Sequence, residues 1–241
     1  ARGQTLFITC MPKSGSTFLL QALKEATGYT DAMLTYAYER NEQDLYLPRL
    51  IDRQYENTVT RHHTRASGPN LELFHRFDIR PVVLVRDLLD VAVSVRDHLL
   101  LEGHRNFPAL YAPSSYTRMG SGEQLDFVVD HSMPWYVQYY AGWYEAWESG
   151  ELDMLWLRYE ELVADWSHGI ARILEFHGLG DRVGQVEAAI AASYQSALSV
   201  KRLNRGVVGR GQLELSAAQR SRIRDLACYY YRDVEFSFVG L

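Results

Sequence analysis

Residues 12–18 read Pro-Lys-Ser-Gly-Ser-Thr-Phe, which brings a lysine, a glycine and three hydroxyl groups into one short segment. The segment follows an apolar run at residues 5–10 and precedes an amphipathic stretch at residues 17–26. A loop that leads from a buried strand into a helix presents unpaired N–H groups and a partial positive charge to an anion. Lys13 adds a mobile ammonium, and Gly15 lets the backbone approach the anion closely. The segment therefore predicts a phosphate-binding loop.

The position of Lys13 distinguishes this loop from the Walker A loop of nucleotide triphosphatases. In a Walker A loop the lysine follows the last glycine and stands beside a Ser or Thr that holds Mg²⁺. Here the lysine precedes Gly15 by two residues, and none of the apolar runs ends in an aspartate suited to the metal. These features disfavour a P-loop nucleotide kinase, which stays as an alternative function. For the loop itself, the alternative is an ordinary helix N-terminus beside a surface lysine.

A second junction between a strand and a helix carries Arg86. This residue follows the apolar run at residues 82–85 and precedes a helical pattern at residues 88–101. Ligands of open parallel sheets bind beyond the carboxyl ends of the strands, where Arg86 can meet an anion. Ser94 comes a little over two helical turns later and shares roughly the same face if the helix begins at the arginine. The alternative is an ion pair between Arg86 and Asp90, with Ser94 incidental.

Strands and helices that alternate along the chain would position these groups. Continuous apolar runs are typical of strands covered by helices on both faces, and they lie at residues 5–10, 58–63, 82–85 and 154–157. Helical patterns lie at residues 17–26, 88–101, 134–148, 170–177, 183–192 and 217–231. The alternation predicts an α/β fold with a parallel sheet flanked by helices on both faces. No repeat or linker divides the sequence, so residues 1–241 are expected to form one domain.

Composition restricts the partners of the chain. Its 241 residues are 47% hydrophobic and 23% charged, with a formal net charge of −5, so no basic field is expected to attract nucleic acid or an anionic membrane. No run approaches the roughly 20 apolar residues of a membrane helix, and the sequence begins without a signal-peptide pattern. Both cysteines, Cys10 and Cys228, are expected to be buried thiols in a reducing compartment, and the protein is expected to be cytoplasmic.

Two segments lack a helical or strand pattern. Residues 103–124 mix Gly, Pro, Ser and Tyr, and a loop of this length is usually functional or disordered. Residues 195–213 contain four basic residues and no acidic one. An acidic protein thus concentrates cations in a late, glycine-containing segment, as expected if this segment meets an anionic ligand.

Four segments taken together resemble the sulfotransferases that use 3′-phosphoadenosine 5′-phosphosulfate (PAPS). They are the loop P-K-S-G-S-T-F, the motif R-D-x-x-D-x-x-V-S that starts at Arg86, the Tyr-Glu ending of residues 157–161, and Asn204-Arg205-Gly206-Val-Val-Gly209. They follow the order of the family and span residues 12–209. The resemblance implies a fold like that of P-loop nucleotide triphosphatases. It also implies PAPS as the cofactor and adenosine 3′,5′-bisphosphate (PAP) as its product.

The resemblance assigns nucleotide-binding roles residue by residue. The group that would hold the 5′-phosphosulfate comprises Lys13, Ser14, Gly15, Ser16, Thr17 and Phe18. The remaining groups are Arg86 and Ser94 for the 3′-phosphate, Tyr159 for the nucleotide, and Arg205 with Gly206 for a loop that closes over the 3′-phosphate. Two positions depart from the family. Asn204 stands where a basic residue is frequent, so Arg205 is expected to act alone, and Gly211 stands where cytosolic members commonly have a tryptophan.

Sulfuryl transfer needs a group that stabilises charge on the leaving phosphate and a base that takes the proton of the acceptor. Lys13 fits the first role. The family has Lys-x-His at the end of its second strand, and Arg61-x-His63 keeps that spacing. His63 is therefore the expected base, because a neutral histidine can accept a proton near pH 7. His62 is the alternative, since neighbouring strand residues face opposite ways. The chemistry requires no metal.

The expected acceptor is a small molecule with a hydroxyl or an amine; its identity and the oligomeric state of the protein stay open. Aromatic residues could line the acceptor pocket or could simply pack in the core. They are, with one methionine, Tyr111, Tyr116, Met119, Trp135, Tyr136, Tyr139, Tyr140 and Trp143. A further alternative is a non-catalytic nucleotide-binding domain of a larger assembly.

Overall fold

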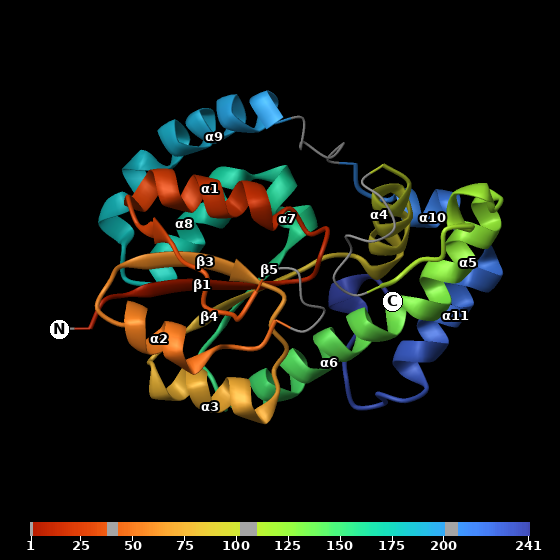
Figure 1. The fold of residues 1–241 in the computed structure, drawn as a ribbon, viewed down its shortest axis with the longest axis horizontal. Coiled ribbons are helices and arrows are strands. Elements are labelled where there is room, and N and C mark those ends of the chain that lie inside the picture. The colour runs from red at the N-terminus through yellow and green to blue at the C-terminus, as the bar shows by residue number, and fades with distance from the viewer. Residues whose placement is uncertain (1, 38–42, 102–109, 201–206) are drawn as a thin grey trace.

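A five-stranded sheet forms the centre of the computed structural model (Figure 1), which describes all residues except 1, 38–42, 102–109 and 201–206. All strands are parallel, in the order β2-β3-β1-β4-β5. They are β1 (Thr5–Cys10), β2 (Thr30–Asp31), β3 (Thr58–His62), β4 (Pro81–Val85) and β5 (Leu155–Arg158). The four predicted strands are confirmed with small shifts of their ends, and β2 is a short additional strand at the edge.

The central strands β3, β1 and β4 are buried on both faces, and β4 is apolar at every position. Leu6, Ile8 and Cys10 of β1 pack into one core, whereas Phe7 packs into the other. Successive residues of a strand face opposite sides, so burial between two helical layers favours apolar residues at every position. This explains the unbroken apolar residues of β4 and most of those of β1, whereas β3 buries Thr58, Thr60 and His62.

Helices cover both faces of the sheet (Figure 1). One core includes residues of α1 (Ser16–Thr27), α7 (Tyr159–Ala164), α8 (Trp166–Phe176) and α9 (Val186–Val200). The other includes residues of α2 (Leu47–Arg53), α3 (Gly68–Arg76), α4 (Leu88–Leu101), α5 (Ser121–His131), α6 (Met133–Glu148) and α11 (Ala217–Cys228). A short helix, α10 (Arg210–Glu214), packs on α4. The 3₁₀ turns are η1 (Tyr116–Arg118), η2 (Gly180–Gln185) and η3 (Ser237–Val239). Each of the predicted helices is present.

The structure corrects two expectations. The end of the segment 103–124 is helical, because α5 begins at Ser121, and the Glu123 carboxylate caps it by accepting the Gly120 N–H at 2.8 Å. Cys228, expected to be buried, is exposed at the end of α11, whereas Cys10 is buried in β1. In the late basic segment, α9 continues to Val200 and α10 begins at Arg210.

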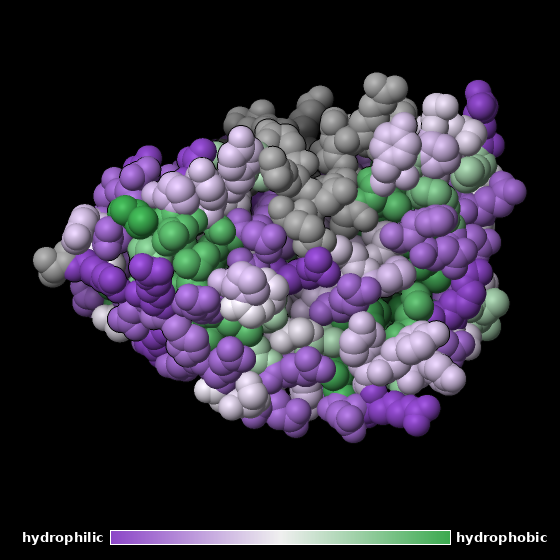
Figure 2. Space-filling view, turned by 60° about the horizontal axis from the view of Figure 1, so that its bottom comes forward, coloured by the Kyte–Doolittle hydropathy of each residue, from purple (hydrophilic) through white to green (hydrophobic). Residues whose placement is uncertain are grey.

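Hydrophilic residues cover most of the face shown in Figure 2, and hydrophobic residues lie between them in separate groups. Among the described residues, none of the helices has the length and apolar composition that are needed to cross a membrane.

Candidate functional site

The loop between β1 and α1 has an unusual backbone conformation. Lys13 has a φ of 71° and Gly15 a φ of 80°, so both lie in the left-handed region. The buried hydroxyl of Ser14 donates to the Met11 carbonyl oxygen at 2.6 Å and closes the turn from inside. Helix α1 begins at Ser16 without a side-chain cap from the described residues. The first-turn N–H groups of α1 therefore have no side-chain partner there and suit an anion.

Gly15 lies against the ring of Tyr159, which comes from the junction of β5 and α7. A Cβ atom on Gly15 would be 2.8 Å from Cε2 of Tyr159, and its left-handed φ is one that only glycine adopts without strain. The loop thus requires glycine at this position for two independent reasons. The same contact brings Tyr159, a predicted nucleotide-binding residue, to the loop.

Replacing Gly15 by alanine is expected to destabilise the protein more than replacing Gly28, at the other end of α1. Both glycines are left-handed, and a Cβ on Gly28 would meet nothing within 4 Å. The backbone cost is roughly 1–2 kcal/mol at either position. Gly15→Ala adds a collision with Tyr159, for which we expect about 1 kcal/mol or more. Urea denaturation of both variants measures the difference, and equal losses would contradict the Tyr159 contact.

Arg86 connects the loop to the segment before α10. Its side chain is almost fully buried; Nη1 donates to the Lys13 carbonyl oxygen at 2.8 Å and Nη2 to the Val207 carbonyl oxygen at 3.3 Å. The guanidinium carbon lies 4.2 Å from the centre of the Tyr159 ring, and Nη2 lies 3.8 Å from Oδ2 of Asp90. Nε is buried and has no hydrogen-bond partner among the described residues. The ion pair with Asp90 that was the alternative for Arg86 is present, and the guanidinium still keeps a donor for an anion.

Helix α4 brings His98 into contact with Lys13. The sequence assigned no role to His98. The Lys13 ammonium donates from Nζ to Nδ1 of His98 at 3.2 Å, and Nδ1 must accept because an ammonium has no lone pair. Ser94, one turn before His98, is buried, whereas His98 is partly exposed, and this spacing is the signal that could have identified His98. Because α4 begins at Leu88, Arg86 lies outside the helix. The argument that Arg86 and Ser94 share a helical face therefore does not apply.

His63 follows β3 and lies against the end of β1. Its Nδ1 is 2.7 Å from the Cys10 carbonyl oxygen, which can only accept, so Nδ1 carries the proton and Nε2 the lone pair. The His63 backbone N–H donates to the Gln43 side chain at 2.7 Å. Burial lowers the pKa of His63 to about 4, although the hydrogen bond to Cys10 opposes that shift. His63 is therefore neutral at pH 7, with Nε2 free of its own proton.

His62 has a different environment, as expected for the neighbouring residue of a strand. It is fully buried, and its Nε2 accepts the Leu34 backbone N–H at 3.1 Å and lies 2.8 Å from Oγ1 of Thr60. Burial, together with the nearby charges of His63 and Arg61, lowers the pKa of His62 to about 3. The lone pair of His62 is therefore already engaged inside the protein and is not available to take another proton.

These two buried histidines predict a loss of stability in mild acid. An ordinary histidine has a pKa of 6.5, whereas the folded values are about 3 for His62 and about 4 for His63. Between those values the unfolded chain binds protons that the folded chain does not, so the free energy of unfolding falls as the pH falls from 6.5 toward 4. We expect roughly 2 kcal/mol of loss per histidine by about pH 5.

Asp87 has the opposite effect on the free energy of unfolding in acid. Burial raises the pKa of Asp87 from 3.8 to about 6, so the folded state takes up a proton first and regains roughly 1 kcal/mol as the pH falls to about 5. Urea denaturation at neutral and at mildly acidic pH measures the net loss. His62→Gln should reduce the pH dependence by one histidine, and a free energy of unfolding that does not fall in acid would exclude the buried neutral histidines.

Comparison with known proteins gives these contacts a family context. The family model described as sulfotransferase domain matches residues 4–212. The chain belongs to the sulfotransferase domain family. Its fold is similar to that of mouse sulfotransferase SULT7A1 complexed with PAP, with a TM-score of 0.70, 16% identity, and coverage of 97% of this chain and 86% of that chain.

This sulfotransferase domain also resembles a retinol dehydratase in complex with androsterone and the inactive cofactor PAP. The TM-score is 0.60 at 16% identity, and the match covers 96% of this chain and 81% of that chain. A search of curated protein sequences found no match.

The sulfotransferase domain brings together only part of the predicted loop. The Phe18 ring packs on the side of α8 and α9, with centres 4.5 Å from Trp166 and 4.7 Å from Tyr194. Thr17 is exposed, whereas Ser16 is buried. The sequence gave no role to Trp166, which lies 3.7 Å from where a Cβ on Gly15 would stand. Arg205 and Gly206, predicted to cover the 3′-phosphate, lie outside the described residues.

Most of the predicted acceptor-pocket aromatics lie in the core of the sulfotransferase domain. The buried ones are Tyr116, Tyr136, Tyr139, Tyr140 and Trp143, while Tyr111 is exposed. Two of them support the loop and the end of β1 from α6: Tyr136 donates to the Pro12 carbonyl oxygen at 3.2 Å, and the Tyr139 hydroxyl lies 2.7 Å from Oγ1 of Thr9 in β1. Burial raises the pKa of both tyrosines well above 10. These hydroxyls therefore stay protonated and act as hydrogen-bonding supports.

Proposed function

We propose that this sulfotransferase domain transfers a sulfuryl group from PAPS to a hydroxyl or an amine of a small-molecule acceptor. Sulfuryl transfer is the activity of the family, and both similar structures hold PAP, which supports PAPS as the donor. The observation that carries the proposal is the position of Arg86. Its buried guanidinium contacts the Lys13 carbonyl and the Tyr159 ring and keeps Nε unpaired among the described residues.

The available donors suit a polyanionic nucleotide. Lys13, Gly15, Ser16 and Thr17 would hold the 5′-phosphosulfate, through an ammonium, two hydroxyls and first-turn N–H groups of α1. The groups proposed for the rest of the nucleotide are Arg86, Ser94, Tyr159, Arg205 and Gly206. The Ser14 hydroxyl already donates to Met11, and Phe18 packs away on α8 and α9. We therefore assign Ser14 and Phe18 to the support of the loop.

PAPS would supply a sulfuryl group already attached to a phosphate leaving group. The ammonium of Lys13 would stabilise the negative charge that develops on that phosphate. Nε2 of His63 would take the proton of the acceptor, and the Nδ1–H bond to the Cys10 carbonyl would keep the imidazole in the required tautomer. With a pKa of about 4, His63 is unprotonated throughout the neutral range, so it would hold the lone pair that the step needs.

Calorimetric titration with PAP in the presence of EDTA tests the donor. We expect PAP to bind without Mg²⁺, because the proposed ligands are all side chains and N–H groups of the chain. Titration with ATP and Mg²⁺ is the matched measurement for a nucleotide kinase. Tight Mg²⁺-dependent binding of ATP together with no binding of PAP would exclude the proposal.

An acceptor screen with isotopically labelled PAPS, read by mass spectrometry, tests the transfer. A library of phenols, alcohols and amines should contain molecules that gain the labelled sulfuryl group. The buried aromatics of α6 leave the acceptor class unspecified, so the library should be broad. Binding of PAP without transfer to any of a broad set of acceptors would favour the non-catalytic nucleotide-binding alternative.

A further inference from the structure

The carboxylate of Asp90 joins α4 to the start of α10. Asp90 is almost fully buried; its Oδ2 accepts the Gly209 N–H at 2.8 Å, and its Oδ1 accepts the Gly211 N–H at 2.7 Å. Both oxygens are thus committed to the backbone of one short segment. A carboxylate that accepts two backbone N–H groups is a strong anchor, because charge-assisted hydrogen bonds are about twice as strong as neutral ones.

Gly211 allows this close approach. A Cβ atom on Gly211 would lie 2.3 Å from the carbonyl carbon of Leu89 and 2.4 Å from its Cβ. Any side chain at this position would therefore push α10 away from α4 and lengthen the hydrogen bonds to Asp90. The tryptophan that is common here in cytosolic members could not be placed on this backbone. The departure at Gly211 is part of how this chain packs α10.

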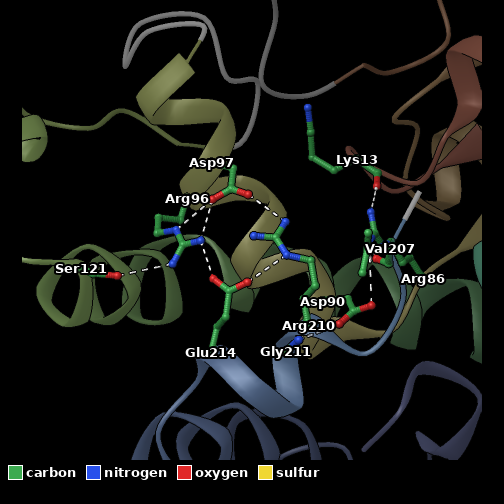
Figure 3. A network of polar contacts seen from close by, with 10 residues as sticks. All are labelled: Lys13, Arg86, Asp90, Arg96, Asp97, Ser121, Val207, Arg210, Gly211 and Glu214. Atoms are coloured by element: carbon green, nitrogen blue, oxygen red, sulfur yellow. Dashed lines mark hydrogen bonds and ion pairs between the residues drawn. The ribbon is translucent and has the colours of Figure 1, made fainter. Parts of the chain in front are cut away.

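Four charged side chains hold α10 to α4 on the outer side of Asp90 (Figure 3). Arg96 contacts Asp97 and Glu214 at 2.6 Å, and Arg210 contacts the same two carboxylates at 2.8 Å. Arg96 and Asp97 belong to α4, and Arg210 and Glu214 belong to α10. Each arginine contacts both carboxylates, so each of the four residues makes an ion pair with the other helix. We refer to Asp90, Gly211 and these four residues as the α4–α10 contact.

Arg86 lies next to the α4–α10 contact and is bound to it through Val207 and Asp90. Val207, two residues before Gly209, accepts a hydrogen bond from Nη2 of Arg86 at 3.3 Å, and Nη2 lies 3.8 Å from Oδ2 of Asp90. Asp90 thus fixes the Val207 carbonyl by anchoring the residues that follow it, and it also faces the same guanidinium nitrogen. The other terminal nitrogen, Nη1, is bound to the Lys13 carbonyl oxygen.

We infer that Asp90 is a positioning residue for donor binding, which orients the Arg86 guanidinium through Val207 and the α4–α10 contact. The inference rests on the proposed function, because Arg86 is the proposed ligand of the 3′-phosphate. Both carboxylate oxygens of Asp90 are bound to backbone N–H groups, and the carboxylate faces Arg86. Its loss should therefore weaken donor binding without removing a group that takes part in the chemistry.

The central test is the affinity for PAP of Asp90→Asn, measured by calorimetry, with the KM for PAPS and kcat measured alongside. We expect PAP to bind about tenfold more weakly and the KM for PAPS to rise in parallel, because one charged anchor becomes a neutral one. The kcat at saturating PAPS should stay within about threefold of the wild type. A purely structural role would instead lower kcat and the melting temperature and leave the KM for PAPS unchanged, which would overturn the inference.

A double variant tests whether Asp90 acts through Arg86. Lysine at position 86 keeps the charge but cannot bridge the carbonyls of Lys13 and Val207. PAP binding of Arg86→Lys/Asp90→Asn should therefore be no more than about twofold weaker than that of Arg86→Lys alone. Full additivity of the two losses would overturn the inference. The matched control is Asp130→Asn, which removes an exposed ion pair to Arg222 between α5 and α11 and should leave PAP binding unchanged.

If Asp90→Asn does not fold, a milder variant at Glu214 tests the inference instead. Glu214 is partly exposed, so Glu214→Gln should fold and weaken PAP binding by about threefold through the loss of two ion pairs. Wild-type affinity in Glu214→Gln would then overturn the inference. Failure of the wild-type protein to bind PAP overturns the proposed function and this inference with it. Wild-type binding that Asp90→Asn fully retains overturns the inference alone.

Discussion

Replacing Lys13 by methionine is expected to lower kcat by about 10²- to 10³-fold. Methionine keeps most of the length of the side chain and removes the ammonium that would stabilise the leaving phosphate. The ammonium is fixed in the structure by its hydrogen bond to His98 and by the left-handed loop backbone. Steady-state transfer at saturating PAPS measures the effect. A kcat close to that of the wild type would remove Lys13 from the proposed chemistry.

The left-handed backbone of Lys13 predicts a difference in stability between two variants that both lack the lysine side chain and its contacts. Lys13→Gly should be about 1 kcal/mol more stable than Lys13→Ala, since only glycine adopts this conformation without strain. Both variants should lose kcat to the same extent as Lys13→Met, because both remove the ammonium. Asp78, exposed and with a φ of 56°, is the matched control. Asp78→Gly should gain similarly over Asp78→Ala with transfer unchanged, and equal stability of the two Lys13 variants would contradict a strained loop.

Replacing His63 by glutamine is expected to lower kcat by about 10²- to 10⁴-fold, which is the usual contribution of a positioned base. The glutamine amide can still donate to the Cys10 carbonyl, but its remaining groups are not basic. For the wild type, kcat/KM should stay level from neutral pH down to the pKa of His63, about 4, and fall below it as Nε2 gains a proton. An acid limb centred near 6.5 would show that His63 does not act as the base in this state.

His62→Gln separates catalysis from stability at this strand end. His62 accepts the Leu34 N–H inside the protein, so its replacement should lower the free energy of unfolding and leave kcat of the folded fraction within a fewfold of the wild type. A larger loss of kcat in His62→Gln than in His63→Gln would identify His62, and not His63, as the base.

The layers of the fold follow from the apolar runs, and the shorter elements do not. The strands β1, β4 and β5 and the helix α4 could be predicted because burial favours runs of apolar residues. The strand β3, Thr-Val-Thr-Arg-His, is mostly polar, although all of its residues except Arg61 are buried. The edge strand β2 is two residues long, Thr30–Asp31, and both residues are exposed, so it leaves no hydrophobic pattern. The helices α2 and α3 begin with proline in their first turn and have seven and nine residues, too few for a clear period.

The sequence predicts the parts of the candidate site that belong to local motifs, and it does not predict the contacts between distant segments. Lys13, Gly15 and Arg86 stand at strand ends, a position that the order of elements predicts. The partners of these residues come from distant segments: His98 for Lys13, Tyr159 for Gly15, and Val207 for Arg86. Such pairs follow from the packing of helices on the sheet, and among them only His98, one turn after Ser94, has a signal in local spacing. The choice between His62 and His63 likewise needed the direction of two side chains.

The tyrosines of α6 that support the loop also determine when the loop can become rigid during synthesis. The Pro12–Tyr136 and Thr9–Tyr139 contacts join residues 124 and 130 positions apart. Contacts over such separations form after local helices and turns, because a long chain segment must first be closed. A nascent chain that has released β1, α1 and β4 from the ribosome, but not yet α6, therefore has the residues of the loop without its support. Donor affinity should therefore require the emergence of α6 as well as of the proposed nucleotide ligands that follow it in the chain.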